Sequence, residues 1–451
     1  MSEVTPLSSV AREGSLEAPT RHPLGWREAP FWDTRALEQE LERVFDICHG
    51  CRRCVSLCHA FPTLFDLVDA SPTLEVDGVA KSDYKKVVDQ CYLCDLCYQT
   101  KCPYVPPHAW NVDFPHLMLR AKAQAHRRGE TRWQAKALSN THAVGKLASI
   151  PVVVEAVNAA NRAKPARKLL DKVLGVHPDA TVPTYHARTA RKRLKRMPTV
   201  PTAQPAGPTR GKVAIFVTCY GEYNMPQVVE DLVAVFAHNG IEVKLVEREQ
   251  CCGMPKLELG DLDSVDRYKQ ANLPMLKREI DAGYDLIAPI PSCVLMFKQE
   301  IPLMYPEDAD VAAVRARFFD PFEYLMHRHQ AGLLNTTFAR ELGKVAYHVP
   351  CHQRVQNIGP KTRDILKLIP NTSFEMIERC SGHDGTYGVK SATYALARKI
   401  AKPVVERVER AGAAHFSSDC PMAGAHIAAG VSGGAATATH PISLLRLAYG
   451  L

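Results

Sequence analysis

Eight of the 15 cysteines form two closely spaced runs. The first run is Cys48-x2-Cys51-x2-Cys54-x3-Cys58, and the second is Cys91-x2-Cys94-x2-Cys97-x4-Cys102, which Pro103 follows. Three thiolates spaced in this way can surround one face of an iron–sulfur cube, and the fourth cysteine of each run normally reaches the other cube. The spacing therefore predicts two [4Fe–4S] clusters, one on Cys48, Cys51, Cys54 and Cys102, the other on Cys91, Cys94, Cys97 and Cys58.

Structural zinc and disulfide bonds are the other common uses of clustered cysteines. Structural zinc usually takes two Cys/His pairs a dozen or more residues apart, whereas these runs contain triplets. Disulfides suit short secreted chains, and the residues after Met1 lack the apolar core of a signal peptide. We therefore favour iron–sulfur clusters over zinc and expect a cytoplasmic protein with reduced thiols.

Seven further cysteines lie in a region where strand-like and helix-like runs alternate, from residue 211 to the end of the chain. Lys-Val-Ala at 212–214 leads to Cys219, and Lys-Val-Ala at 344–346 leads to Cys351, with the same offset of 132 residues. Cys251-Cys252-Gly253 corresponds to Cys380-Ser381-Gly382, and Cys293 corresponds to Cys420. The alternation favours α/β units with parallel strands, and the repeated pattern predicts two copies of one unit. Loops at the carboxyl ends of parallel strands share one edge, so these cysteines are expected to converge.

The chain of 451 residues is long enough for several domains, each with its own core. The fold class that we predict is a multidomain α+β protein, in which an α-helical ferredoxin-like domain precedes a tandem repeat of α/β units. The predicted segments are a mobile tail (1–32), a ferredoxin-like domain with two [4Fe–4S] clusters (33–112), a basic helical segment (113–197), a Pro-rich linker (198–210), a first α/β unit (211–340) and a second α/β unit (341–451).

The two ferredoxin-type runs followed by the doubled motif resemble the CCG-domain iron–sulfur oxidoreductases. This family is related to heterodisulfide reductase and includes the iron–sulfur subunit of anaerobic glycerol-3-phosphate dehydrogenase. The resemblance covers about residues 40–110 and 211–451, and it rests in the second unit on the segments at 347–352, 380–383 and 419–421. It implies iron–sulfur electron transfer, with a third cluster in the first unit on Cys219, Cys251, Cys252 and Cys293.

The chain departs from the fullest pattern of that family, which ends in Cys-x-x-Cys. Ile290 and Ser417 occupy the first of those cysteine positions, which puts a five-cysteine, noncubane cluster in doubt. Ser381 leaves only Cys351, Cys380 and Cys420 in the second unit. His383, His348 or His352 could add a nitrogen ligand there, as histidine does in Rieske centres. A fourth cluster in the second unit and an empty, structural second unit are both open interpretations.

Between Arg120 and Arg210 there are 19 Lys or Arg residues and 4 Asp or Glu residues, although the whole chain carries only +8. Such a charge run is often no more than a solvated face. It would also suit docking to an acidic redox partner or attraction to anionic lipids, whereas little aromatic interleaving disfavours nucleic acid. No run of 18 apolar residues is present, so any membrane contact is expected to be peripheral, at the inner face of the cell membrane.

We predict an electron-transfer protein or subunit that relays electrons between its clusters and a separate redox partner. The partner would be a flavoprotein dehydrogenase, a quinone or, as relatives suggest, a rubrerythrin-like di-iron protein. The chain shows no Gly-rich dinucleotide fingerprint, so we expect no flavin or nicotinamide on it. Two alternatives are a catalytic reductase of disulfides or small substrates, of the heterodisulfide reductase type, and a membrane- or nucleic-acid-binding iron–sulfur module.

Overall fold

The computed structural model describes residues 18–200, 203–434 and 437–451. The chain divides into an N-terminal part, which ends at Gln124, and a C-terminal part, which begins at Ala125. The predicted tail lies outside the described residues as far as residue 17. Its remainder packs against the N-terminal part, because Trp26 and Phe31 are buried. Residues 201 and 202 of the predicted linker also lie outside the described residues.

The described residues of the N-terminal part form helices and no strand. The longest helix, α2, begins after Asp33, whose side chain accepts a hydrogen bond from the Ala36 N–H at 2.9 Å and so caps the helix. Its buried positions recur at helical spacing, which turns one face toward the core. The main helices are α1 (Ala29–Trp32), α2 (Thr34–Cys51), α3 (Ala60–Asp69), α4 (Tyr84–Gln90), α5 (Leu96–Thr100) and α6 (Phe114–Arg127).

The C-terminal part contains, close to its start, a helical segment that we define as residues 133–193. Its helices are α7 (Trp133–Leu138), α8 (Thr141–Ala148), α9 (Pro151–Arg162), α10 (Lys164–Leu174) and α11 (Ala190–Arg193). Helix α8 packs on the first α/β unit, where Gly145 lies so close to Tyr223 that an added Cβ would stand 2.3 Å from the ring. The loop after α10 packs on the second α/β unit, where the His177 ring stacks on Tyr394 at 3.9 Å.

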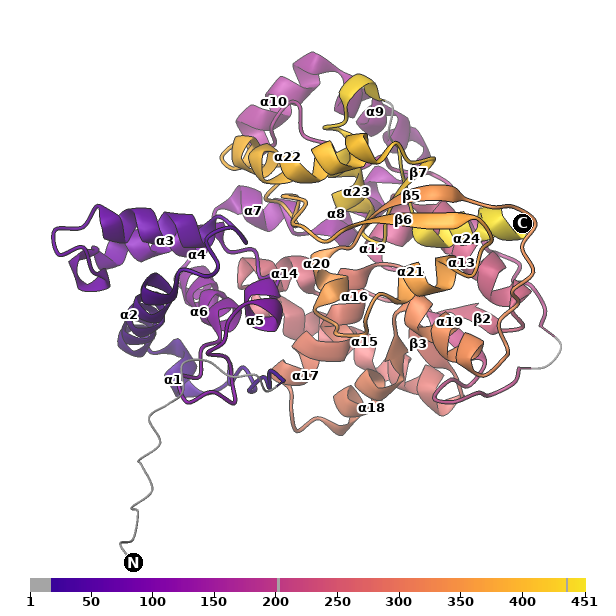
Figure 1. Cartoon of the computed structure of the whole chain (residues 1–451), viewed down its shortest axis with the longest axis horizontal. Helices are drawn as coiled ribbons and strands as arrows, with labels where there is room; N and C mark the ends of the chain where they lie inside the picture. Colours follow the sequence, from indigo (N-terminus) through magenta and orange to yellow (C-terminus); the bar gives the residue numbers. More distant parts are fainter. Residues whose placement is uncertain (1–17, 201–202, 435–436) are drawn as a thin grey trace, which may run out of the picture. The chain divides into compact units, whose positions relative to one another are not determined.

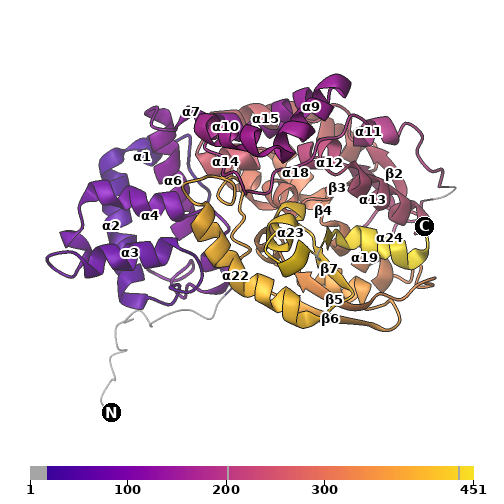
Figure 2. The same cartoon turned by 90° about the horizontal axis from the view of Figure 1, so that it is seen from above.

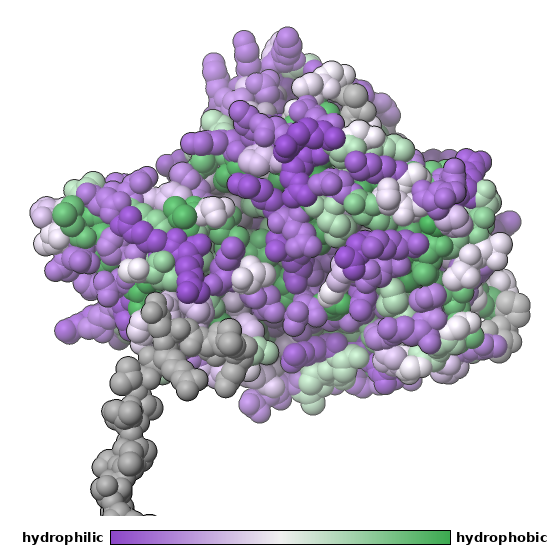
Figure 3. Space-filling model, viewed as in Figure 1, coloured by the Kyte–Doolittle hydropathy of each residue, from purple (hydrophilic) through white to green (hydrophobic). Residues whose placement is uncertain are grey.

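No single helix among the described residues is long and apolar enough to cross a membrane. Helices α8 and α9 together meet that test of length and composition, with a bend of 109° between them. The side of α10 seen in Figure 3 is mainly hydrophilic, and its exposed side chains include Lys164, Lys168 and Lys172.

The first repeat, residues 211–340, contains a four-stranded parallel sheet with the strand order β2-β1-β3-β4. Its strands are β1 (Lys212–Ile215), β2 (Glu242–Leu245), β3 (Asp285–Ile287) and β4 (Phe318–Phe319). Its helices are α12 (Cys219–Tyr223), α13 (Pro226–His238), α14 (Met254–Leu259), α15 (Leu262–Asp281), α16 (Pro291–Leu295), α17 (Ile301–Met304), α18 (Ala309–Arg317) and α19 (Pro321–Gln330), and a π-helical turn at Met296–Glu300 follows α16.

The second repeat, residues 341–451, has the equivalent parallel sheet, with the order β6-β5-β7-β8. Its strands are β5 (Gly343–His348), β6 (Thr372–Ile377), β7 (His415–Ser418) and β8 (Ala438–Thr439). Its helices are α20 (Cys351–Arg354), α21 (Lys361–Leu366), α22 (Tyr394–Ala411), α23 (Pro421–Ala428) and α24 (Pro441–Tyr449). The predicted pair of parallel α/β units is therefore confirmed.

The two repeats share one hydrophobic core. Buried side chains of both sheets, such as Val213 and Val345, belong to the same cluster. Helix α13 of the first repeat packs on α24 of the second, and the two lie side by side in Figures 1 and 2. Helix α19 of the first repeat likewise packs on α21 of the second. Since α13 is equivalent to α21 and α19 to α24, an approximate two-fold axis relates the repeats.

Candidate metal centres

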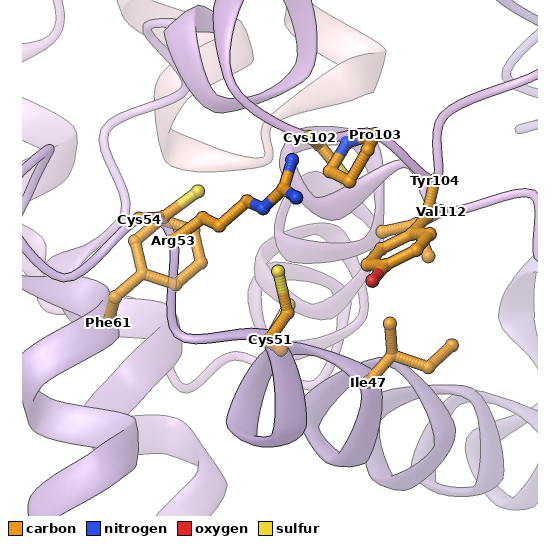
Figure 4. A pocket seen from close by; sticks show the side chains of 10 residues that line it. Ile47, Cys51, Arg53, Cys54, Phe61, Cys102, Pro103, Tyr104 and Val112 are labelled. Atoms are coloured by element: carbon orange, nitrogen blue, oxygen red, sulfur yellow. The ribbon is translucent and has the colours of Figure 1, made fainter. Parts of the chain in front are cut away.

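The first set of predicted ligands converges on one pocket in the N-terminal part. Cys48 and Cys51 lie in the last turn of α2, which Arg52 ends in the left-handed conformation. Cys54 lies in the turn that follows, and Cys102 lies just after α5. All four cysteines line one pocket, and Figure 4 shows the sulfur atoms of Cys51 and Cys54 pointing into it. Cys102 belongs to the second run but lies with three cysteines of the first run, which is the set predicted for the first cluster.

The chemistry of this pocket fits a cationic cluster better than four free thiols. Burial, followed by the charges of Cys102, Cys54 and Cys51, raises the pKa of Cys48 well above its usual value. Burial and the charges of Cys102 and Cys51 raise the pKa of Cys54 to about 12, although Lys101 and Arg53 oppose the shift. Thiolates crowded in this way form together only when a metal supplies the balancing positive charge.

The second set of predicted ligands gathers around Cys97, on α5. The pKa of Cys97 is raised by burial and then by the charges of Cys94, Cys91, Cys58 and Cys54. Three of these neighbours complete the predicted set, and the fourth, Cys54, belongs to the first pocket. The two predicted cluster sites of the N-terminal part therefore adjoin.

A third group of thiols lies at the carboxyl edge of the sheet in the first repeat. Cys219 follows β1, Cys251 and Cys252 follow β2, and Cys293 follows β3, as the parallel topology predicts. Hydrogen bonds between neighbouring side chains connect Cys219 to Cys251, Cys251 to Cys252, and Cys252 to Cys293. All four predicted ligands are thus brought together, and three of them are buried.

One side-chain hydroxyl and one backbone N–H lie within hydrogen-bonding distance of these sulfur atoms. The Thr141 hydroxyl, at the start of α8, lies 3.3 Å from Cys219 Sγ and 3.8 Å from Cys251 Sγ. The Gly253 N–H donates to Cys251 Sγ at 3.5 Å. Hydrogen bonds to thiolates are a main control of cluster potential. No sequence pattern indicated Thr141, because it lies 78 residues before the first cysteine of the repeat.

The second repeat places its three cysteines at the equivalent sheet edge. Cys351 begins α20, Cys380 follows β6 and Cys420 immediately precedes α23. The Gly382 N–H donates to Cys380 Sγ at 3.3 Å, which repeats the Gly253 contact. Ser381 stands at the position of Cys252, and its hydroxyl accepts a hydrogen bond from the His383 N–H at 3.3 Å.

The three histidines considered as ligands have different surroundings. Both ring nitrogens of His348 are bonded, one to the Ser418 hydroxyl at 3.0 Å and one to the Arg379 carbonyl at 3.1 Å. The Nδ1 atom of His352 bonds to the Ser292 hydroxyl at 2.8 Å.

The buried Nε2 atom of His383 has no hydrogen-bond partner among the described residues, so its lone pair is not committed to another protein group. Its ring lies 5.8 Å from that of His426, a neighbour that sequence reasoning did not find.

Within the described ranges, no three His, Cys, Asp or Glu side chains converge as closely as the ligands of a single metal ion. The thiolates of an iron–sulfur cube stand farther apart, since each binds a different iron atom of the cube. The residues present therefore fit the donor set of a cluster in the two N-terminal sites and in the first repeat.

Comparison with known proteins also finds two copies of one domain in this chain. The family model described as "Cysteine-rich domain", CCG, matches residues 213–298 and 345–428. One subunit of the anaerobic glycerol-3-phosphate dehydrogenase of Escherichia coli K12 is 28% identical over 314 residues, which cover 68% of this chain and 75% of the relative. One subunit of the fumarate reductase (CoM/CoB) of Methanothermobacter marburgensis is 28% identical over 48% of this chain and 41% of its own length. Lactate utilization protein A of Bacillus pumilus is 28% identical over 46% of this chain and 87% of its own length.

The fold and the cysteine edges define a protein with two parallel α/β units that present thiols for an iron–sulfur cofactor. The chain contains two copies of the CCG cysteine-rich domain, and it is homologous to this anaerobic glycerol-3-phosphate dehydrogenase subunit and to other iron–sulfur proteins.

Proposed function

We propose that the protein is an iron–sulfur electron-transfer subunit. The N-terminal part is a ferredoxin-like domain with two [4Fe–4S] clusters, and the first repeat holds a third. The observation that carries this proposal is the pocket that Cys48, Cys51, Cys54 and Cys102 line together. Cys54 of this set also acts electrostatically on Cys97, as do the three predicted partners of Cys97. Adjoining clusters suit the stepwise passage of single electrons.

The clusters supply the redox chemistry when they are bound, and the residues of this chain tune it. Burial of thiols such as Cys48 and Cys97 excludes water from the sites. The cationic side chains of Lys101 and Arg53 act on Cys54 and favour its thiolate. At the first repeat, the Thr141 hydroxyl contributes a hydrogen bond. These groups would set the order of potentials along the relay.

The electrons come from or go to a separate redox partner. Support comes from relatives whose names identify them as subunits of a dehydrogenase and of a reductase. A flavoprotein dehydrogenase fits this arrangement, as does a quinone or a rubrerythrin-like di-iron acceptor.

Iron and acid-labile sulfide should be measured on protein purified without oxygen. We expect about twelve irons per chain, which corresponds to three cubes. Reductive titration followed by EPR should then show that each cluster accepts one electron. Protein that holds zinc, or that binds no iron under these conditions, would contradict the proposal.

An anionic membrane surface is the second partner that we propose, and it would place the protein at the inner face of the cell membrane. The support is an apolar surface on α8 and α9, where Leu147 is 63% exposed and Val152 is 85% exposed. Exposed cations flank it, namely Lys146, Arg162, Lys164, Lys168 and Lys172. Apolar side chains ringed by Lys and Arg are typical of helices that lie in a membrane interface.

Vesicle co-sedimentation tests this surface. The full-length protein should bind vesicles with anionic lipid, bind neutral vesicles weakly, and dissociate as salt rises. Val152→Asp should reduce binding several-fold. Leu74→Asp is the matched control, because Leu74 is a similarly exposed apolar residue in the N-terminal part. Equal binding to neutral and anionic vesicles, or an equal loss in both variants, would contradict the membrane proposal.

A further inference from the structure

The segment that precedes α1 carries Arg21, whose guanidinium group bonds to two carboxylates. Its Nε atom donates to Asp113 Oδ2 at 2.9 Å, and its Nη2 atom donates to Asp113 Oδ1 at 3.1 Å. The Nη2 atom also donates to Asp95 Oδ1 at 3.1 Å, and Nη1 donates to Asp95 Oδ2. The Arg21 side chain is only 8% exposed and that of Asp95 only 6%. Two-pronged pairing of this kind fixes the position of the positive charge.

The chain around Arg21 is held against α5, the helix that contains Cys97. The Thr20 N–H donates to the Pro106 carbonyl oxygen at 2.9 Å, and the Tyr98 hydroxyl donates to the Thr20 carbonyl oxygen. The Arg21 guanidinium also lies over the Tyr98 ring, 4.8 Å from the ring centre. Although sequence analysis assigned this segment to a mobile tail, its backbone and side chain are therefore tied to the helix that follows Asp95.

Asp95 lies inside the run of predicted ligands of the second cluster. It directly follows Cys94 and precedes Cys97 by two residues. Consecutive Cα atoms are about 3.8 Å apart, so its charge is held within one residue of a predicted ligand. A carboxylate in this place opposes the addition of an electron to the cluster, and a cation bound to the carboxylate reduces that opposition.

Asp113 is the second carboxylate bound to Arg21, and it immediately precedes α6. Burial opposes its ionisation, but the charges of Arg21 and His116, and hydrogen bonds from both residues, lower the pKa of Asp113 to about 2. Asp113 is therefore ionised at neutral pH. One guanidinium and two carboxylates leave the three side chains with a single net negative charge.

We propose that Arg21 raises the reduction potential of the cluster on Cys91, Cys94, Cys97 and Cys58. Its charge offsets the Asp95 carboxylate, so an electron added to this cluster meets less repulsion. Arg21 acts through Asp95 and is a positioning residue, not a ligand. The inference rests on the proposed function, because it requires a cluster at this site. It also gives the segment before α1 a role in setting the order of potentials along the relay.

Potentiometric titration of the full chain, purified without oxygen and followed by EPR at about pH 8, tests this role. The signal of the second cluster is the one that Cys91→Ser abolishes. Arg21→Gln should lower the ratio of reduced to oxidised second cluster about tenfold at a fixed potential, which is about 59 mV for one electron. Asp95→Asn should shift the ratio in the opposite direction. Both variants weaken the same contact, so a role limited to packing would not produce shifts of opposite sign.

Three further variants separate charge from packing. Arg27→Gln is the matched control, because Arg27 is an exposed arginine of the same segment, and its potential should equal that of the parent protein. Arg21→Lys keeps the positive charge and should retain most of the parent potential. The double variant Arg21→Gln with Asp113→Asn again carries one net negative charge, and its potential should return toward that of the parent protein.

The outcomes separate this inference from the proposed function. Equal potentials in Arg21→Gln and Arg27→Gln, or a double variant no closer to the parent than Arg21→Gln, would overturn the inference alone. If Arg21→Gln does not retain the second cluster, Asp95→Asn decides, and a potential that is unchanged or lower in Asp95→Asn would overturn the inference. A Cys91→Ser variant with as much iron as the parent would overturn the proposed second cluster as well, because no cluster would occupy this site.

Discussion

The two repeats share a sheet topology but differ in the side chains at its edge. The first repeat presents four thiols connected by hydrogen bonds. The second has Ser381 in place of one thiol, and it is rich in buried histidine. These histidines are His348, His352, His383, His426 and His440. The strand order of the second repeat is nevertheless equivalent to that of the first. The hydrophobic core that both repeats share, rather than a full ligand set, therefore maintains the fold.

The turn that carries the central cysteine pair is also kept in both repeats. Gly253 and Gly382 have positive φ angles of 103° and 71°, and each donates its N–H to the cysteine two residues before it. The loop geometry has thus persisted where a thiol was replaced by a hydroxyl. The repeats therefore differ in the side chains that they present at this edge, not in the backbone of the turn. Substitutions at equivalent positions can test this difference.

The largest effect is expected when the first repeat is made to resemble the second. Cys252→Ser removes a thiol that is hydrogen-bonded to both Cys251 and Cys293. We expect the loss of about four irons per chain, because three thiolates cannot ligate every iron of a cube. Iron and sulfide analysis of anaerobic protein measures the loss.

Ser381→Ala is the equivalent control for Cys252→Ser. It removes the hydroxyl at the matching position of the second repeat, and we expect no change in iron content. If both variants lose the same amount of iron, or if neither does, the proposed difference between the repeats is wrong.

The two glycines should differ in the stability that they confer. A Cβ at Gly382 would lie 2.2 Å from the Ala397 carbonyl oxygen, which is backbone and cannot turn aside, whereas a Cβ at Gly253 would meet the flexible Met296 side chain at 3.3 Å. Positive φ costs either alanine about 1–3 kcal/mol. Overpacking adds about 1–3 kcal/mol at Gly382.

We therefore expect Gly382→Ala to lower the free energy of unfolding by about 4 kcal/mol and Gly253→Ala by about 2 kcal/mol. Urea unfolding of both variants, followed by circular dichroism, measures the two values. A larger loss in Gly253→Ala would show that the first repeat, not the second, has the tighter turn.

Much of this architecture could be predicted from the sequence. The spacing of the cysteine runs predicted that Cys102 joins the first run, because short spacings limit which thiols can share a cluster. Cys102 does line one pocket with Cys48, Cys51 and Cys54. The repeat offset and the alternation of apolar runs predicted two parallel sheets. Short strands such as β4 and β8 were not anticipated, since two residues leave no periodicity to detect.

The contacts between the repeats could not be predicted in this way. The hydrogen bond between His352 and Ser292 depends on the two-fold packing of α13 on α24 and of α19 on α21. The contact of Thr141 with two sulfur atoms depends on how α8 docks. Tertiary contacts of this kind leave no local pattern in the sequence, because the residues are far apart in the chain.

Buried histidine should make the second repeat sensitive to mild acid. Burial lowers the pKa of His348 from 6.5 to about 4, so between these values the unfolded chain binds a proton that the folded chain does not. The stability from His348 is complete above pH 6.5 and is lost as pH falls toward 4. From about pH 7 to about pH 5 the loss is about 2 kcal/mol.

His348→Gln should therefore flatten the pH dependence of the urea midpoint between about pH 7 and about pH 5. His22→Gln is the control, because His22 is exposed in the N-terminal part. A pH profile that is the same in His348→Gln as in the parent protein would contradict the assignment of a buried, neutral imidazole at this position.

The smallest effect concerns Thr141, which touches the thiols of the first repeat. Its hydroxyl lies 3.3 Å from Cys219 Sγ, and a hydrogen bond there stabilises the more negative, reduced state of a cluster. Thr141→Val keeps the shape of the side chain and removes the hydroxyl. We expect the potential of the third cluster to fall by about 30 mV, which corresponds to part of one hydrogen bond.

A potentiometric titration monitored by EPR can measure this shift. Thr141→Ser keeps the hydroxyl and should retain the potential of the parent protein, which separates the hydrogen bond from packing around α8. The potentials of the two N-terminal clusters should not change in either variant. If Thr141→Ser shifts the potential as far as Thr141→Val does, the packing of α8, and not its hydroxyl, tunes the first repeat.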